Sequence, residues 1–154
     1  MINTPLTDAF NDEQVTPNFW LSEFLFSDFY SERAQERVLE AFYSNELVFM
    51  RNVKELARNL QALRDYLGCA VSINIGYRPK WWELKQGRSG NSQHTQAWAA
   101  DIVSEDHKPE EVADAIEFLI EKGIMNQGGL GRYRTFTHYD LFSPDADGRR
   151  WGRN

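Results

Sequence analysis

The segment Ser92–Asp101, which reads SQHTQAWAAD, holds the most informative pattern in the chain. It places the imidazole of His94 and the carboxylate of Asp101 seven positions apart, with small alanines between them. Imidazole nitrogen and carboxylate oxygen are both zinc ligands, and a catalytic zinc ion takes three protein ligands and keeps one open position. The spacing therefore suggests two ligands of a metal site and requires a third from elsewhere in the sequence.

A second histidine, His138, lies in the alternating, aromatic-rich run TFTHYDL at residues 135–141, which is typical of a strand. Side chains two positions apart share one face of a strand, so His138 and Asp140 would lie about 7 Å apart at Cα and could serve one site. His138 is the third candidate ligand, with His94 and Asp101. Two roles stay open for Asp140: general base, or a carboxylate that orients a histidine ligand.

The position of Asp101 supports its role as a ligand. The run Ala99–Val103, AADIV, predicts a strand, and a carboxylate inside an apolar strand costs free energy unless it is paired or coordinated. The alternative is a hydrogen-bonded structural aspartate. The third histidine, His107, lies in a charged turn outside these patterns, and we expect it to be exposed to solvent.

Four residues of the first segment, Ser92, His94, Ala99 and Asp101, match the pattern Ser-x-His-x-x-Gly-x-Ala-x-Asp, whereas Ala97 stands in place of the glycine. The segment thereby resembles the signature of the zinc D-alanyl-D-alanine peptidases of family M15, a family of peptidoglycan-cleaving metallopeptidases. Four of the five positions match.

Three further segments resemble the same family in the same order along the chain. They are NFWLSEF at residues 18–24, NIGYRP at residues 74–79 and HYD at residues 138–140. The last resembles the closing His-x-Asp of a subgroup common in phages and bacteria. Together the segments span most of the sequence, and their order is more specific than any one motif.

The resemblance implies an α+β fold of the hedgehog and DD-peptidase type, in which a small antiparallel sheet carries a zinc cleft and packs against helices. It implies that His94, Asp101 and His138 hold zinc, and that Arg78 and Ser92 help to hold the substrate. The alternative role for Arg78, in the rigid Tyr-Arg-Pro turn, is a structural ion pair, because a guanidinium suits both purposes.

The chain departs from its relatives just before the last candidate ligand. Many family members place a glutamate three residues, or a histidine two residues, before that histidine, whereas this chain has Thr135 and Phe136 there. Asp140 is the carboxylate nearest to His138 in the sequence. The identity of the proton acceptor that peptide hydrolysis needs therefore stays open.

Apolar periodicity and capping residues predict the other elements. Helices are expected over residues 31–44, 45–67 and 109–122, with a helical turn over 80–86. A strand is expected over 69–75, a loop over 87–92, and a glycine-rich connection over 128–131 leading to the final strands. Trp81, Trp82 and Trp98 are candidates for the walls of the cleft, and no role is assigned to the closing residues 149–151.

Length and charge limit the function further. A chain of 154 residues suits one packed core, so we expect a flexible arm over residues 1–16 and one domain over residues 17–154. The formal charge of −6 argues against nucleic acid as a partner, and no apolar run suits a membrane span. The single cysteine fits synthesis in a reducing compartment. We expect a monomer.

These observations favour a zinc metallopeptidase that hydrolyses stem or cross-bridge peptides of peptidoglycan, as a phage- or prophage-type lysin or virion component. No export signal is visible at the start of the sequence, so the protein would be made in the cytoplasm and reach the cell wall after release or inside a virion. One alternative is a non-catalytic zinc module on the same fold. Another is a metal-free structural protein with a satisfied His-Asp-His cluster.

Overall fold

The segments that contain Asp101, His138 and Asp140 are strands of one five-stranded sheet. In the computed structural model, which describes residues 4–152, the strands lie in the order β3-β4-β6-β5-β7. Every pairing is antiparallel except that of β7 with β5, which is parallel. The expected α+β architecture is confirmed, whereas the glycine-rich strand β5 and the edge strand β7 were not predicted. Their bounds are β3 Val71–Ile75, β4 Ala99–Ser104, β5 Gly129–Arg132, β6 Thr137–Asp140 and β7 Arg149–Gly152.

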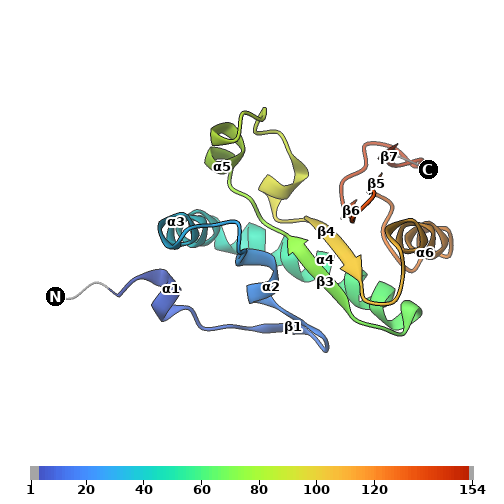
Figure 1. Ribbon diagram of the computed structural model, residues 1–154, viewed down its shortest axis with the longest axis horizontal. Coiled ribbons are helices and arrows are strands. Elements are labelled where there is room, and N and C mark those ends of the chain that lie inside the picture. The colour runs from blue at the N-terminus through green and yellow to red at the C-terminus, as the bar shows by residue number, and fades with distance from the viewer. Residues whose placement is uncertain (1–3, 153–154) are drawn as a thin grey trace.

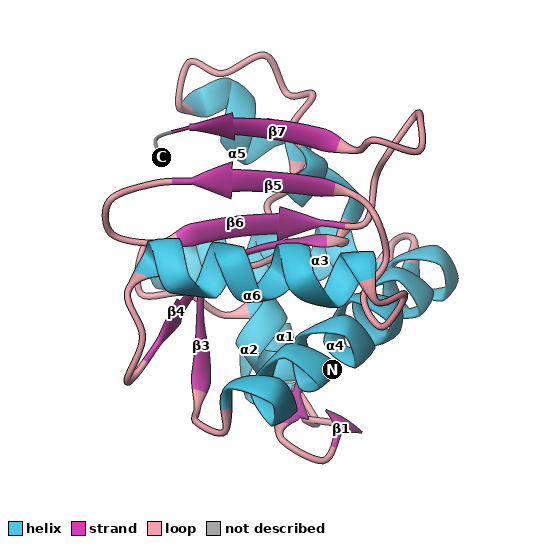
Figure 2. Cartoon of the chain, turned by 90° about the vertical axis from the view of Figure 1, so that its right-hand side faces the viewer, coloured by secondary structure: helices cyan, strands magenta, loops and turns pink. Residues whose placement is uncertain are grey.

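The three longest helices occupy the ranges predicted from apolar periodicity. They are α3 (Glu32–Tyr43), α4 (Glu46–Leu67) and α6 (Pro109–Glu121). The α4 helix buries an apolar stripe and ends at Gly68, which adopts the left-handed conformation at φ 69°. The α6 helix covers one face of the sheet, against β4, β5 and β6 (Figure 2). Within residues 4–152, no helix combines the length and the apolar character that a membrane span requires.

The register of β4 and β6 gives the sheet one apolar and one polar face. Ala100 lies opposite Tyr139, whose buried hydroxyl is within hydrogen-bond distance of Asn59 Oδ1 on α4, at 3.1 Å. Asp101 lies opposite His138, and because neighbouring side chains alternate in direction, these two point away from that core. In the chain, α5 (Lys80–Lys85) and the short 3₁₀ helix η1 (Gln93–Gln96) connect β3 to β4, and Figure 1 shows this connection at the end of the two strands where β4 begins.

The N-terminal segment is attached to the domain by backbone hydrogen bonds. Strand β1 (Gln14–Thr16) pairs with β2 (Phe19–Trp20), so the hairpin crosses the expected boundary after residue 16. The amides of Leu6 and Thr7, in the single turn α1 (Leu6–Ala9), donate to the carboxylate of Glu36 on α3. The polar sequence does not reveal these contacts, because main-chain amides make them. The division into an arm over residues 1–16 and a domain over residues 17–154 stays a prediction. Residues 1–3 lie outside the described residues.

The remaining short helix, α2 (Leu21–Leu25), follows β2 directly, and the carboxylate of Glu23 accepts a hydrogen bond from the amide of Trp20 at 2.7 Å. This hydrogen bond satisfies one of the free donors at the start of the helix. Leu21, Phe24 and Leu25 are buried in the core. Burial of the Glu23 carboxyl raises its pKa, although the hydrogen bond acts in the opposite direction.

The backbone conformation at Ala97 explains why the family pattern has glycine at this position. It follows η1 with φ 62° and ψ 25°, and it is the one non-glycine residue with positive φ among residues 4–152. The left-handed conformation costs an L-residue roughly 1–2 kcal/mol, and glycine avoids this cost. Here the alanine methyl is buried, so packing offsets part of the strain.

The variants Ala97→Gly and Ala100→Gly separate these contributions, because both remove a buried methyl but only the first relieves positive φ. Ala97→Gly should change the free energy of unfolding by less than about 1 kcal/mol. Ala100→Gly, in strand β4, should cost about 1–2 kcal/mol. Urea unfolding of both variants measures the difference. Equal losses would show that the turn at Ala97 stores no strain.

Candidate metal centre

Three side chains from three elements of the fold converge at the polar face of the sheet. His94 comes from η1, Asp101 from β4 and His138 from β6. One nitrogen or oxygen of each lies within 4.8 Å of the others. Asp101 Oδ1 is 3.3 Å from His94 Nε2 and 3.0 Å from His138 Nδ1. Within residues 4–152 this is the one group of three such side chains close enough to share a metal ion.

Hydrogen bonds on the far side of each imidazole fix which nitrogen faces the centre. His94 Nδ1 lies 2.7 Å from the carbonyl oxygen of Gly76, which can only accept, so Nδ1 carries the proton and Nε2 offers its lone pair. His138 Nε2 lies 2.6 Å from Asp140 Oδ2. It therefore donates to this carboxylate and leaves the lone pair of Nδ1 available to a metal ion. Two nitrogens and one carboxylate oxygen form a donor set that fits zinc.

The charges of the three groups follow from their burial and their partners. Burial lowers the pKa of His94, which favours the neutral imidazole that binds metal. Burial opposes ionisation of Asp101, yet its close contacts with His138 and His94 hold its pKa well below the usual value. Burial also works against a charge on His138, but its contacts with Asp101 and Asp140 raise its pKa overall.

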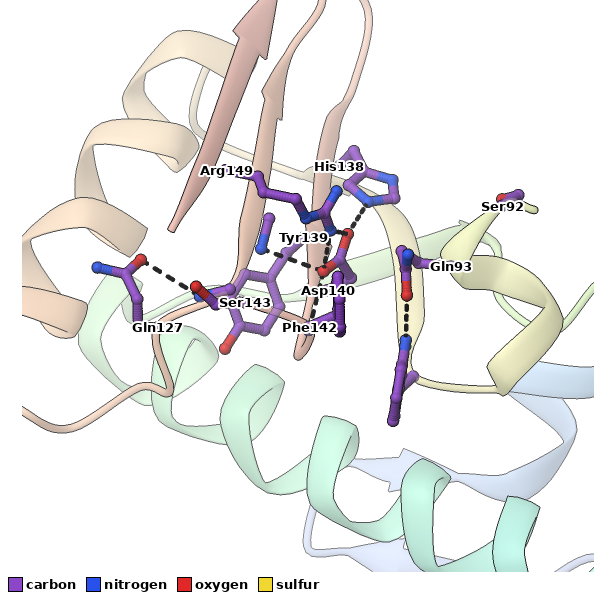
Figure 3. A network of polar contacts seen from close by, with 12 residues as sticks. Ser92, Gln93, Gln127, His138, Tyr139, Asp140, Phe142, Ser143 and Arg149 are labelled. Carbon is purple, nitrogen blue, oxygen red and sulfur yellow. Dashed lines mark hydrogen bonds and ion pairs between the residues drawn. The ribbon is translucent and has the colours of Figure 1, made fainter. Parts of the chain in front are cut away.

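Asp140 is fully buried, and its carboxylate accepts hydrogen bonds from four directions. Oδ1 accepts from the amides of Gly129 (3.1 Å) and Phe142 (3.0 Å), and Oδ2 accepts from His138. The Nη2 atom of Arg149 lies 2.6 Å from both oxygens, and Figure 3 shows Asp140 between this guanidinium and His138. A carboxylate has about four acceptor positions, so none is left for a water proton. This geometry favours the orienting role for Asp140 over that of general base.

Arg149 was not recognised in the sequence, because its role depends on strand β7, which brings it over β5 to Asp140. Trp151, two positions further along the same strand, was also unassigned. Its ring lies 5.0 Å from that of His138, centroid to centroid. The alternation of β7 would have placed both side chains on one face, had the strand been predicted.

A cleft of about 410 Å³ opens onto the three candidate ligands. Arg78 and Ser92, the two predicted substrate-binding residues, both line it. The Ser92 hydroxyl accepts a hydrogen bond from the amide of His94 at 3.2 Å, and Figure 3 shows Ser92 across from His138. Arg78 lies 3.7 Å from the carboxylate of Glu83, so it makes the structural ion pair as well as facing the cleft. The other lining residues are Arg88, Asn91, Gln93, His94, Asp101, Tyr133, Phe136, His138, Asp140, Arg149 and Trp151.

The three tryptophans expected at the cleft walls lie next to it instead. Trp82 lines an adjoining cavity of about 410 Å³, while Trp81 and Trp98 line another, whose wall includes residues of η1. His107, expected to be exposed, is half-buried, with Nδ1 3.4 Å from Cys69 Sγ. It lies outside the metal group, which makes it a useful control.

Alanine substitutions of the histidines test the ligand set. His94→Ala and His138→Ala should each abolish stoichiometric zinc binding, because two ligands and an open cleft hold the ion poorly. His107→Ala should bind one zinc ion per chain, like the unsubstituted protein. Elemental analysis after dialysis measures the ratio. Zinc retained in both ligand variants would place the ion elsewhere.

Asp140→Asn tests the orienting role. An amide is a poorer partner for the Nε2 proton of His138 and for Arg149, so zinc affinity should fall roughly 10- to 100-fold. Competition with a chromophoric chelator measures the affinity. Asp106→Asn, in an exposed turn, should leave it unchanged. If Asp140→Asn loses turnover at full zinc affinity, Asp140 is the base.

Comparison with known proteins identifies the family. The family model described as Peptidase M15 matches residues 30–140, which include all three candidate ligands and Asp140. No curated protein and no solved structure matches the chain significantly. The matched range covers well over half of the sequence. The chain belongs to the M15 family of peptidases.

Proposed function

We propose that the protein is a zinc-dependent peptidase that hydrolyses stem or cross-bridge peptides of peptidoglycan. The observation that carries the proposal is the convergence of His94, Asp101 and His138 within 4.8 Å at the wall of an open cleft. A catalytic zinc ion needs this arrangement, with three protein ligands and space for a water molecule and the substrate. The family match supports a peptidase, and the resemblance of residues 92–101 to the D-alanyl-D-alanine peptidases supports the substrate class.

Each side chain of the site has a role in this proposal. When bound, zinc would polarise the scissile carbonyl and lower the pKa of a water molecule. Asp140 is a positioning residue, which holds the His138 ring so that Nδ1 points to the ion. Arg78 and Ser92 lie at opposite ends of the segment that leads into η1, and both line the cleft. We assign the Arg78 guanidinium and the Ser92 hydroxyl to substrate binding.

The resemblance of the closing His-x-Asp motif to a subgroup common in phages and bacteria supports a role as a lysin or virion component. A protein of this kind would meet peptidoglycan after release from the cytoplasm or from a virion particle. No nucleic acid, membrane or second protein is needed for the reaction, and we propose that the monomer is active.

A non-catalytic zinc module is the second candidate. Two observations favour it: Thr135 and Phe136 occupy the positions where many relatives carry an acid or a histidine, and the acceptor positions of Asp140 are filled. Such a module would hold zinc and bind peptide without turnover.

Release of peptides from purified sacculi distinguishes the two candidates. The zinc-loaded protein should release soluble peptides, detected by mass spectrometry, and a chelator should stop the release until zinc is restored. His107→Ala should behave like the unsubstituted protein, whereas His94→Ala should release nothing. Intact sacculi in the presence of fully zinc-loaded, folded protein would contradict the peptidase and support the binding module.

A further inference from the structure

A buried carboxylate lies behind the wall of the cleft, outside the metal group. Glu83, on α5, has no exposed surface, and its Oε2 lies 2.7 Å from Arg88 Nη1 and 3.7 Å from Arg78 Nε. The amide of Arg88 also donates to the carbonyl of Glu83 at 2.9 Å, just after the end of α5. One acid thus holds two guanidinium groups together.

This cluster is incomplete as a purely structural ion pair. Glu83 Oε1 and Arg78 Nε are buried, and neither has a hydrogen-bond partner within residues 4–152. Burial of a charged group costs several kcal/mol unless hydrogen bonds and an opposite charge replace the water that it loses. Buried polar groups in folded proteins are nearly always hydrogen-bonded, so the two unpartnered atoms beside the cleft call for an explanation other than stability.

The cluster also leaves an excess of positive charge on one side of the cleft. Arg149 is matched by Asp140, and Asp101 faces the two imidazoles. Arg78 and Arg88, in contrast, share the single charge of Glu83. The whole chain carries a formal charge of −6, so this cation excess is local and would attract an anionic part of a substrate.

Both arginines face the cleft that holds the candidate ligands. Arg78 and Arg88 line the cleft that opens onto the ligands, and they also line the adjoining cavity with Trp82 and Phe136. The Arg88 side chain is half exposed, at 50%, and can therefore reach a bound molecule. A planar guanidinium binds a carboxylate in a bidentate manner, with greater geometric specificity than an ammonium.

We propose that Arg88 is the second guanidinium of a carboxylate-binding subsite, and that Glu83 is the residue that positions it beside Arg78. The substrate class is a peptide with a free carboxylate close to the cleaved bond. The inference rests on the proposed peptidase function for its substrate, but the subsite itself does not require the metal.

Equilibrium binding tests the subsite without turnover. The probes are a stem pentapeptide with its free carboxylates and the same peptide with those carboxylates converted to amides. Calorimetry on metal-free protein, repeated on zinc-loaded protein, should give an affinity for the free-carboxylate peptide at least 10-fold above that for the amide. Arg88→Gln should reduce this ratio several-fold and leave the affinity for the amide unchanged. Arg51→Gln, which removes an exposed cation on α4, should leave the ratio as it is.

Double substitution tests the positioning role of Glu83. Glu83→Gln should lower the same ratio, but in the Arg88→Gln background it should have little further effect, because it acts through Arg88. A merely structural role would lower both affinities together and leave the ratio intact. If Glu83→Gln does not fold, Arg88→Lys still tests the subsite, since it keeps the charge but loses the fork and should retain only part of the preference.

The outcomes separate this inference from the proposed function. Equal affinity of the unsubstituted protein for the two peptides, or an unchanged ratio in Arg88→Gln, overturns the subsite whether or not the protein cleaves sacculi. A clear carboxylate preference that depends on Arg88, without any cleavage, supports the subsite and contradicts the peptidase.

Discussion

The register of two antiparallel strands is the constraint on which the site depends. Pairing of β4 with β6 sets Asp101 directly opposite His138, and a shift of either strand by one residue would turn its own side chain into the apolar core and separate the pair. Tyr139 holds this register from the other face, where its hydroxyl meets Asn59 of α4. Packing of the core and geometry of the metal group are therefore two results of one pairing.

Hydrogen bonds between side chains of β6 and β7 hold His138 in place, and glycines in the intervening strand β5 make room for these side chains. His138 is held by Asp140, and Asp140 by Arg149, whose side chain crosses β5 from β7. A Cβ at Gly129 would collide with both Asp140 and Arg149, and one at Gly131 would collide with the ring of Trp151. The glycines of β5 thus leave room for the side chains that orient the ligand.

The three candidate metal ligands could be predicted from the sequence. His94, Asp101 and His138 were found from spacing, from the charge inside an apolar strand and from family resemblance, and the structure brings them together. Strand β5 was predicted as a connection because glycines that serve close packing look the same as glycines that serve a turn. Arg149 and Glu83 were missed because their partners are set by packing between elements that no periodicity reveals.

In the zinc-loaded protein, His94 Nε2, His138 Nδ1 and one oxygen of Asp101 should hold a single zinc ion. A crystal structure of the zinc-loaded protein, with an anomalous difference map at the zinc edge, tests it directly. One peak is expected at about 2.0–2.2 Å from these three atoms, with His138 Nε2 still hydrogen-bonded to Asp140. A peak elsewhere, or zinc bound through His138 Nε2, would contradict it.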